Sequence, residues 1–155
     1  MAAGSSTTDA RSTADREILI TRVFDAPREL VFDAFLDLEH IGEWWGPAGF
    51  RITTQSMDVR PGGEWRFVMH GPDGAHYQNH SVFVEVVPPE RIVINHVSGP
   101  HFHLTITLAE QAGRTKLSWR MLFESAAECD KVKTFAVPAN EQNLDRLETE
   151  LAAMA

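Results

Sequence analysis

The stretch Glu43–Phe50, EWWGPAGF, places two adjacent tryptophans directly before a Gly-Pro-x-Gly turn. Neighbouring side chains diverge on a helix and alternate between the two faces of a strand, so Trp44 and Trp45 cannot share one environment. One of them can pack in a core while the other lies over a rim or opening. Glycine and proline then turn the chain sharply into the next segment. The stretch therefore predicts the mouth of a cavity.

The segment before the tryptophans predicts a strand followed by two helices. Glu17–Phe24 alternates as a strand does, and Asp25 is placed to cap the next helix, with Pro27 in its first turn. Apolar residues then recur at helical spacing as far as about Asp37, and a short second helix is expected over Leu38–Trp45.

The segment after the turn predicts an antiparallel sheet. Six stretches alternate between apolar and polar residues, and turns rich in glycine or proline separate most of them. These strands are expected at Phe50–Val59, Glu64–His70, Tyr77–Val87, Arg91–Val97, His101–Ala109 and Thr115–Phe123. Because an antiparallel sheet can bury one face and expose the other, the large apolar side chains should gather on one face.

A helix is expected at the C-terminus. Ser125 and Glu128 form a capping box at its start, and Pro138 is expected to kink or break it. The apolar stripe of the terminal part consists of Leu144, Leu147 and Leu151. Twisted strands curl into a half-barrel, and one helix about 10 Å wide cannot fill that hollow, so space is expected between helix and sheet.

Length and charge narrow the class of protein. At 155 residues the chain predicts a disordered N-terminal tail over residues 1–15 and a single domain over residues 16–155. The net charge of −8 disfavours nucleic acid and anionic membrane surfaces, and no apolar stretch is long enough to span a membrane. The single cysteine, Cys129, and the lack of an apolar leader segment fit a cytoplasmic location.

Three segments carry a family resemblance: the tryptophan stretch, Asp58–Gly74 (DVRPGGEWRFVMHGPDG) and Val87–Ile92 (VPPERI). Together they resemble the family named after the activator of the heat-shock chaperone ATPase, within the START-like, or SRPBCC, superfamily. The resemblance extends from about Glu17 to the C-terminus. It implies an α+β helix-grip fold, in which a curled antiparallel sheet wraps around a long C-terminal helix, and a space between them that holds apolar ligands.

The candidate ligand-binding residues are large side chains on the expected inward faces, with two polar residues among them. They are Trp45, Phe50, Trp65, Phe67, Met69, Tyr77, Asn79, Trp119, Met121, Phe135 and Leu144. Tyr77 and Asn79 would be polar anchors if their face turns inward, and a shift of one residue in register would expose them instead. The alternative is that the aromatic residues pack solidly and leave no cavity.

No metal or cofactor is expected. His101 and His103 share one strand face, as a metal pair would, but that face is expected to lie in solvent and no third ligand is evident in the sequence. No nucleophile elbow, phosphate loop or HExxH motif is present. Cys129 lies near a helix start without a histidine partner, so a buried and inert thiol is the favoured interpretation.

Three functions stay open at this point. The first is binding of a small apolar or aromatic ligand in an internal cavity. The second is a cyclase- or dehydratase-type enzyme, which some members of the superfamily are, although no catalytic residues can be named. The third is a partner of a chaperone ATPase, and a homodimer is left open as well. Ligand binding requires least of the sequence and is the leading hypothesis.

Overall fold

The computed structural model describes residues 15–155, so the expectation of a tail over residues 1–15 falls, apart from Asp15, outside the described residues. Seven strands and three helices make up this part of the chain. In chain order they are β1 (Glu17–Phe24), α2 (Arg28–Leu36), α3 (Leu38–Trp44), β2 (Arg51–Met57), β3 (Glu64–His70), β4 (His76–Val87), β5 (Arg91–His96), β6 (Phe102–Gln111), β7 (Arg114–Phe123) and α4 (Ala126–Met154).

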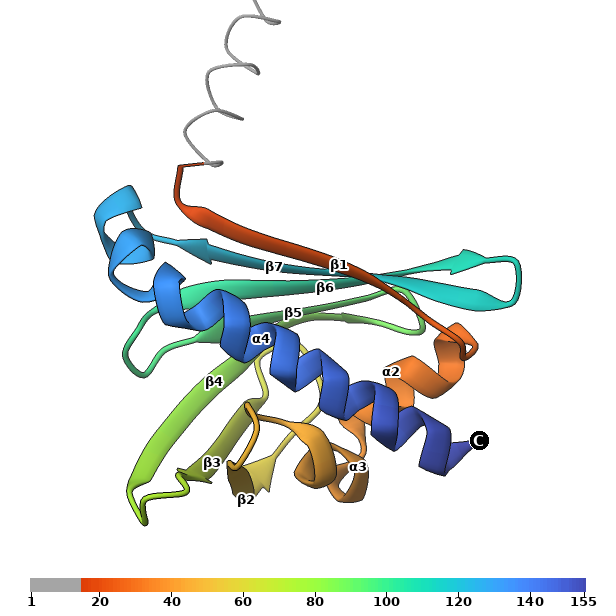
Figure 1. Cartoon of the computed structure of the whole chain (residues 1–155), viewed down its shortest axis with the longest axis horizontal. Coiled ribbons are helices and arrows are strands. Elements are labelled where there is room, and N and C mark those ends of the chain that lie inside the picture. Colours follow the sequence, from red (N-terminus) through yellow and green to blue (C-terminus); the bar gives the residue numbers. More distant parts are fainter. Residues whose placement is uncertain (1–14) are drawn as a thin grey trace, which may run out of the picture.

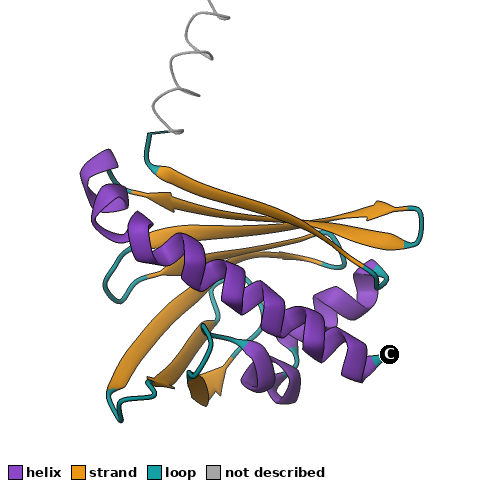
Figure 2. Ribbon diagram, viewed as in Figure 1, coloured by secondary structure: helices purple, strands orange, loops and turns teal. Residues whose placement is uncertain are grey.

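The seven strands form one antiparallel sheet in the order β1-β7-β6-β5-β4-β3-β2. The sheet curls, and α4 crosses its concave face while α2 and α3 lie toward one end (Figure 1). Colouring by secondary structure shows the same arrangement of a strand layer with the helices on one side (Figure 2). The helix-grip fold predicted from the sequence is confirmed.

Two irregularities in strand pairing help the sheet to curl. The register shifts between Thr54 and Ser56 in β2 and between Phe83 and Glu85 in β4. Such bulges insert an extra residue, bend the strand and increase its twist. The bend in β4 comes after Ser81, and the half of β4 that precedes it leans away from β5 and β6 (Figure 1).

The cap predicted at Asp25 was wrong, and of the two outcomes expected at Pro138, a kink or a break, the break does not occur. Asp25 does not cap α2, because Pro27 occupies the N-cap position and no side chain caps the helix there. Pro138 does not break α4, which continues from Ala126 to Met154. Proline removes the bond from its own nitrogen to the carbonyl of Thr134, and Thr134 is exposed, so water can satisfy that carbonyl. Figure 1 shows α4 changing direction in its first third.

The core lies between the concave face of the sheet and the helices. The predicted leucine stripe of α4 is fully or almost fully buried, and the Ser125 hydroxyl accepts the Glu128 N–H at 3.2 Å, as the capping box requires. Arg22 on β1 ties the edge of the sheet to α4, since its guanidinium contacts Glu141 and Asp145 at 2.7 Å each. Within the described residues, none of the helices is long and apolar enough to cross a membrane.

Candidate functional site

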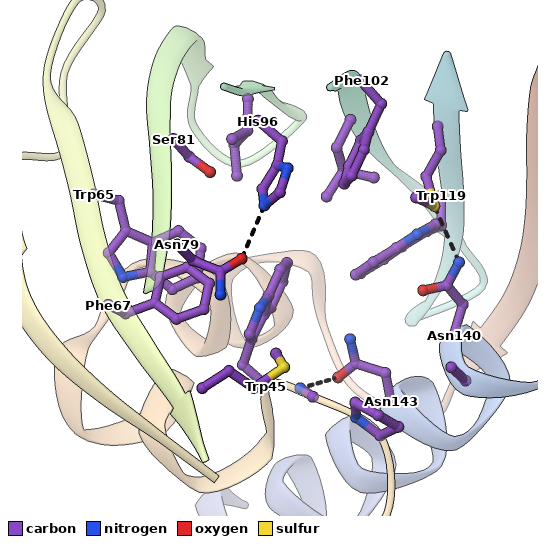
Figure 3. Close-up of a pocket in the computed structure, with 17 residues that line it drawn as sticks. Trp45, Trp65, Phe67, Asn79, Ser81, His96, Phe102, Trp119, Asn140 and Asn143 are labelled. Carbon is purple, nitrogen blue, oxygen red and sulfur yellow. Dashed lines mark hydrogen bonds between the residues drawn. The ribbon is translucent and has the colours of Figure 1, made fainter. Parts of the chain in front are cut away.

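A cavity of about 170 Å³ lies between the concave face of the sheet and α4. We call it the inner cavity; Figure 3 shows its walls. Strands β3 to β7 supply one side, and the Trp45–Pro47 turn and α4 supply the other. Its lining consists of Trp45, Gly46, Pro47, Trp65, Phe67, Met69, Asn79, Ser81, Ile94, His96, Phe102, Leu104, Trp119, Met121, Ala139, Asn140 and Asn143.

The two adjacent tryptophans separate as the sequence predicted. Trp44 is fully buried in the core, where its indole N–H donates to the Ala34 carbonyl at 2.8 Å. Trp45 lies in the wall of the inner cavity, with its ring 5.1 Å from Trp65 and 5.5 Å from Trp119 between centroids. Offset and edge-to-face aromatic contacts at these separations are favourable. The three tryptophans therefore form a rigid aromatic wall.

The turn after Trp45 is held by two residues of α4. Asn143 accepts the Gly46 N–H at 3.1 Å through its side-chain oxygen, and Arg146 donates to the Gly46 carbonyl at 2.9 Å. Arg146 also donates to the carbonyls of Pro47 and Phe50. Gly46 has φ of 110°, a conformation that favours glycine, and a Cβ there would lie 3.3 Å from Phe50 Cβ. These contacts fix the backbone that forms one wall of the cavity.

Asn79 and His96 form a polar pair where the cavity opens. His96 Nε2 lies 2.9 Å from Asn79 Oδ1, and His96 Nδ1 lies 2.8 Å from the Pro100 carbonyl oxygen. Burial lowers the pKa of His96 below its ordinary value, and the hydrogen bond to Pro100 opposes that shift. Burial thus disfavours a charge on the imidazole, which serves as a hydrogen-bonding group at this wall.

Other polar atoms of the wall have no hydrogen-bond partner among residues 15–155. The indole nitrogen of Trp119 is buried without one. The Ser81 hydroxyl and the Asn143 side-chain nitrogen also make no hydrogen bond to the described residues, but these two atoms are accessible from the cavity, and both point into it in Figure 3. An unpaired buried polar group costs about 1–3 kcal/mol. The buried N–H of Trp119 therefore calls for an explanation beyond packing.

The inner cavity opens into a wider outer groove of about 1110 Å³. Pro47, Met69, Asn79, His96, Phe102, Met121, Ala139 and Asn140 line both spaces. The residues that line the groove alone come mainly from the β3–β4 hairpin, the β5–β6 turn and the first half of α4. The inner cavity and the outer groove are therefore adjacent, with eight residues bordering both.

Most of the eleven candidate residues line these two spaces. The inner cavity is lined by Trp45, Trp65, Phe67, Met69, Asn79, Trp119 and Met121. Three others, Phe50, Tyr77 and Phe135, line the outer groove only, and Phe135 is 63% exposed. Leu144 lines neither space, because its side chain is fully buried in the core.

Sequence reasoning missed several polar residues of the wall. Ser81 shares a strand face with Asn79 by the period of two, so the same pattern could have found it. His96 was treated as one of several scattered histidines, and it pairs with Ser81 across β4 and β5. Asn140 and Asn143 are polar residues on α4, and a hydrophobic pattern places such residues in solvent.

His101, one of the two histidines considered for a metal pair, is engaged in other contacts. His101 pairs with Glu124 through Nδ1 and lies 2.8 Å from Asn95 Oδ1 through Nε2. Within the described residues, no group of three or more His, Cys, Asp or Glu side chains is arranged to hold a metal ion. Cys129 is buried, and burial raises the pKa of its thiol.

The curled sheet closed by a long C-terminal helix defines the helix-grip, or START-like, class of protein. The profile of the family described as activator of Hsp90 ATPase homolog 1-like protein matches residues 25–152. The chain therefore belongs to this family, as the resemblance of its motifs indicated.

Solved structures show the same fold. A protein of Nitrosomonas europaea is 20% identical with a TM-score of 0.85, over 92% of this chain and 97% of that chain. A protein of Chromobacterium violaceum is 28% identical with a TM-score of 0.77, over 86% and 95% of the two chains. The AHSA1 protein of Silicibacter pomeroyi is 21% identical with a TM-score of 0.73, over 90% and 99%. The search among curated proteins finds no match.

Proposed function

We propose that this protein binds a small apolar or aromatic molecule in the inner cavity, with part of the ligand or its path in the outer groove. The observation that supports the proposal is the inner cavity beneath α4, with the wider groove adjacent to it. An enclosed, largely apolar pocket with a few polar groups is the usual form of a small-molecule site. A helix and sheet that only formed a core would fill this space with side chains.

Each part of the site has a distinct role in this proposal. Trp45, Trp65 and Trp119 form the aromatic surface, and Phe67, Met69 and Met121 complete the apolar walls. Asn79 provides a polar contact. Phe50, Tyr77 and Phe135 contact whatever part of the ligand extends into the groove.

A library of small aromatic compounds and fatty acids tests the proposal by thermal shift and tryptophan fluorescence. A true ligand at 100 times its dissociation constant should stabilise the fold by about 2.7 kcal/mol. Ala139 lines both spaces, so Ala139→Phe should block the path and abolish the shift. Ala153→Phe, on an exposed position of the same helix, is the matched control and should retain it. If no compound stabilises the wild-type protein, the proposal is wrong.

The same hits address the alternative of a cyclase- or dehydratase-type enzyme. Such chemistry needs a group that donates or accepts a proton at the bound molecule. His96 is the titratable side chain in the wall of the inner cavity. Each hit should be incubated with the wild type and with His96→Gln and then analysed chemically. Conversion that depends on His96 would replace the binding proposal with the enzymatic one.

A further inference from the structure

Two polar atoms on opposite walls of the inner cavity are free to bind a ligand. The Ser81 hydroxyl comes from β4, and the Asn143 amide nitrogen comes from α4, where the Asn143 oxygen is already bonded to Gly46. Both residues are at least 95% buried, and among the described residues neither atom has a hydrogen-bond partner. Both side chains border the inner cavity and point into it (Figure 3), so a ligand there can place its own polar atoms against them.

The walls carry no permanently charged side chain. Charged residues make up 23% of the chain, yet no Asp, Glu, Lys or Arg lines either the inner cavity or the outer groove. Burial lowers the pKa of His96 and so disfavours a charge on that ring. A charged ligand would lose its water in this space and meet no opposite charge. The net charge of −8 adds a long-range repulsion of anions.

The size of the inner cavity fits one aromatic ring. Its volume is about 170 Å³, and an apolar cavity of about 150 Å³ in another protein holds benzene. The rings of Trp65 and Trp119 approach Trp45 at 5.1 and 5.5 Å, so the walls themselves are aromatic faces and edges. A planar ring can pack against such surfaces. Larger ligands would have to extend into the outer groove.

We propose that the inner cavity selects uncharged, single-ring aromatic compounds that carry a hydrogen-bonding oxygen. The Asn143 amide donates to that oxygen, and the Ser81 hydroxyl binds a second polar atom of the ligand. This inference rests on the proposed function, since it names the class of molecule for the same site. It adds selection by charge, which apolar binding alone does not imply.

Four probes of one size test the selection: toluene, benzamide, benzoate and benzamidine. They share a ring and differ in being apolar, neutral and polar, anionic, or cationic. Titration can be followed by NMR through the indole N–H signals of the four tryptophans. Benzamide should bind most tightly, toluene measurably, and both ions about tenfold or more weaker than benzamide.

Two variants test the assigned atoms. Ser81→Ala breaks no hydrogen bond within the described residues, so the fold should persist, and the affinity for benzamide should fall roughly two- to tenfold while toluene is unchanged. Asn143→Asp keeps an acceptor for Gly46 and replaces the donor with a carboxylate. It should reverse the preference of the wild type, so that benzamidine binds more tightly than benzamide.

The outcomes separate the two proposals. Binding of toluene with equal affinity for benzamide, benzoate and benzamidine would overturn the charge selection and leave ligand binding intact. Toluene binding more tightly than benzamide would overturn the role of the polar atoms. An unchanged benzamide affinity in Ser81→Ala would remove Ser81 from the site. Failure of every probe, toluene included, would overturn both this inference and the proposed function.

Discussion

Arg146 should be a larger contributor to stability than its place on a half-exposed helix suggests. Its guanidinium donates to the carbonyls of Gly46, Pro47 and Phe50 through Nη1 and to that of Glu43 through Nη2, at 2.9–3.1 Å. Nη1 carries two hydrogens and has three acceptors, so these bonds are partly shared. Burial lowers the pKa of Arg146, with the Glu43 carboxylate opposing the shift. The group stays charged at any working pH.

The expected cost of Arg146→Met follows from these contacts. A hydrogen bond to a charged group contributes about 1.5–3 kcal/mol, but the shared bonds do not add, and the exposed Glu43 carbonyl regains water. Gly46 is buried, so its carbonyl cannot regain a hydrogen bond to water. Methionine keeps the packing of the aliphatic stem. We expect a loss of about 2–3 kcal/mol in the free energy of unfolding, measured by urea denaturation with the m-value unchanged.

Arg22 supplies a matched control on the other side of α4. It also bridges α4 to another element, but its partners Glu141 and Asp145 have side chains that are 48% and 68% exposed. Exposed pairs contribute about 0.2–1 kcal/mol and weaken with salt. Arg22→Met should therefore cost about 1 kcal/mol or less, and that cost should shrink in high salt. If Arg146→Met lowers the free energy of unfolding no more than Arg22→Met does, the hydrogen bonds from Arg146 to the Gly46 turn are not a significant source of stability.

Two further predictions concern the cavity wall and pH. Trp119 is 2% exposed, so Trp119→Ala should lower the free energy of unfolding by about 3–5 kcal/mol. Trp119→Phe should lower it less, because phenylalanine keeps a ring in the core and removes an unpaired N–H. Equal losses for the two variants would contradict this prediction. Because the pKa of His96 is lowered in the folded state, the free energy of unfolding should fall as pH drops below the ordinary histidine value of 6.5. The pKa of His40, which is bonded to Glu150, is raised, so its contribution to stability should be lost as pH rises above 6.5. The free energy of unfolding of His96→Asn and of His40→Gln should be measured between pH 5 and 8, about 1.5 units on either side of 6.5. Relative to the wild type, the pH dependence of the two variants should change in opposite directions.

The sheet was predictable because its signal is local and periodic. Each strand buries one face, so the alternation around Trp65 and Trp119 determined which side chains point inward. The same rule placed Tyr77 and Asn79 on one face but left open whether that face turns inward, and their pairing with Met69 and Phe67 now puts it on the inward side. The bulges were not predictable, because they depend on how neighbouring strands pair.

The helical side of the site was harder to predict. Phe135 and Leu144 were both expected to face the ligand, yet they are nine residues apart, which is two and a half turns, so they lie on opposite sides of a regular helix. Leu144 is buried in the core and Phe135 is exposed at the edge of the outer groove. Asn143, one residue from Leu144, faces the cavity, and a pattern of apolar residues has no means of selecting it.

One face of α4 both borders the inner cavity and holds part of its wall in place. Ala139, Asn143 and Arg146 follow one another at spacings of four and three, so they share a face. A helix that only closed the core would present large apolar residues there, as it does at Leu147 and Leu151. Instead, the small side chain of Ala139 borders the open space, while Asn143 and Arg146 hold the Gly46 turn in place. Asn143 and Arg146 fix the wall of the inner cavity, so changes at either residue should alter stability and ligand binding together. Ala139 and Ser81 only border the open space, so changes at either should alter binding with little effect on stability.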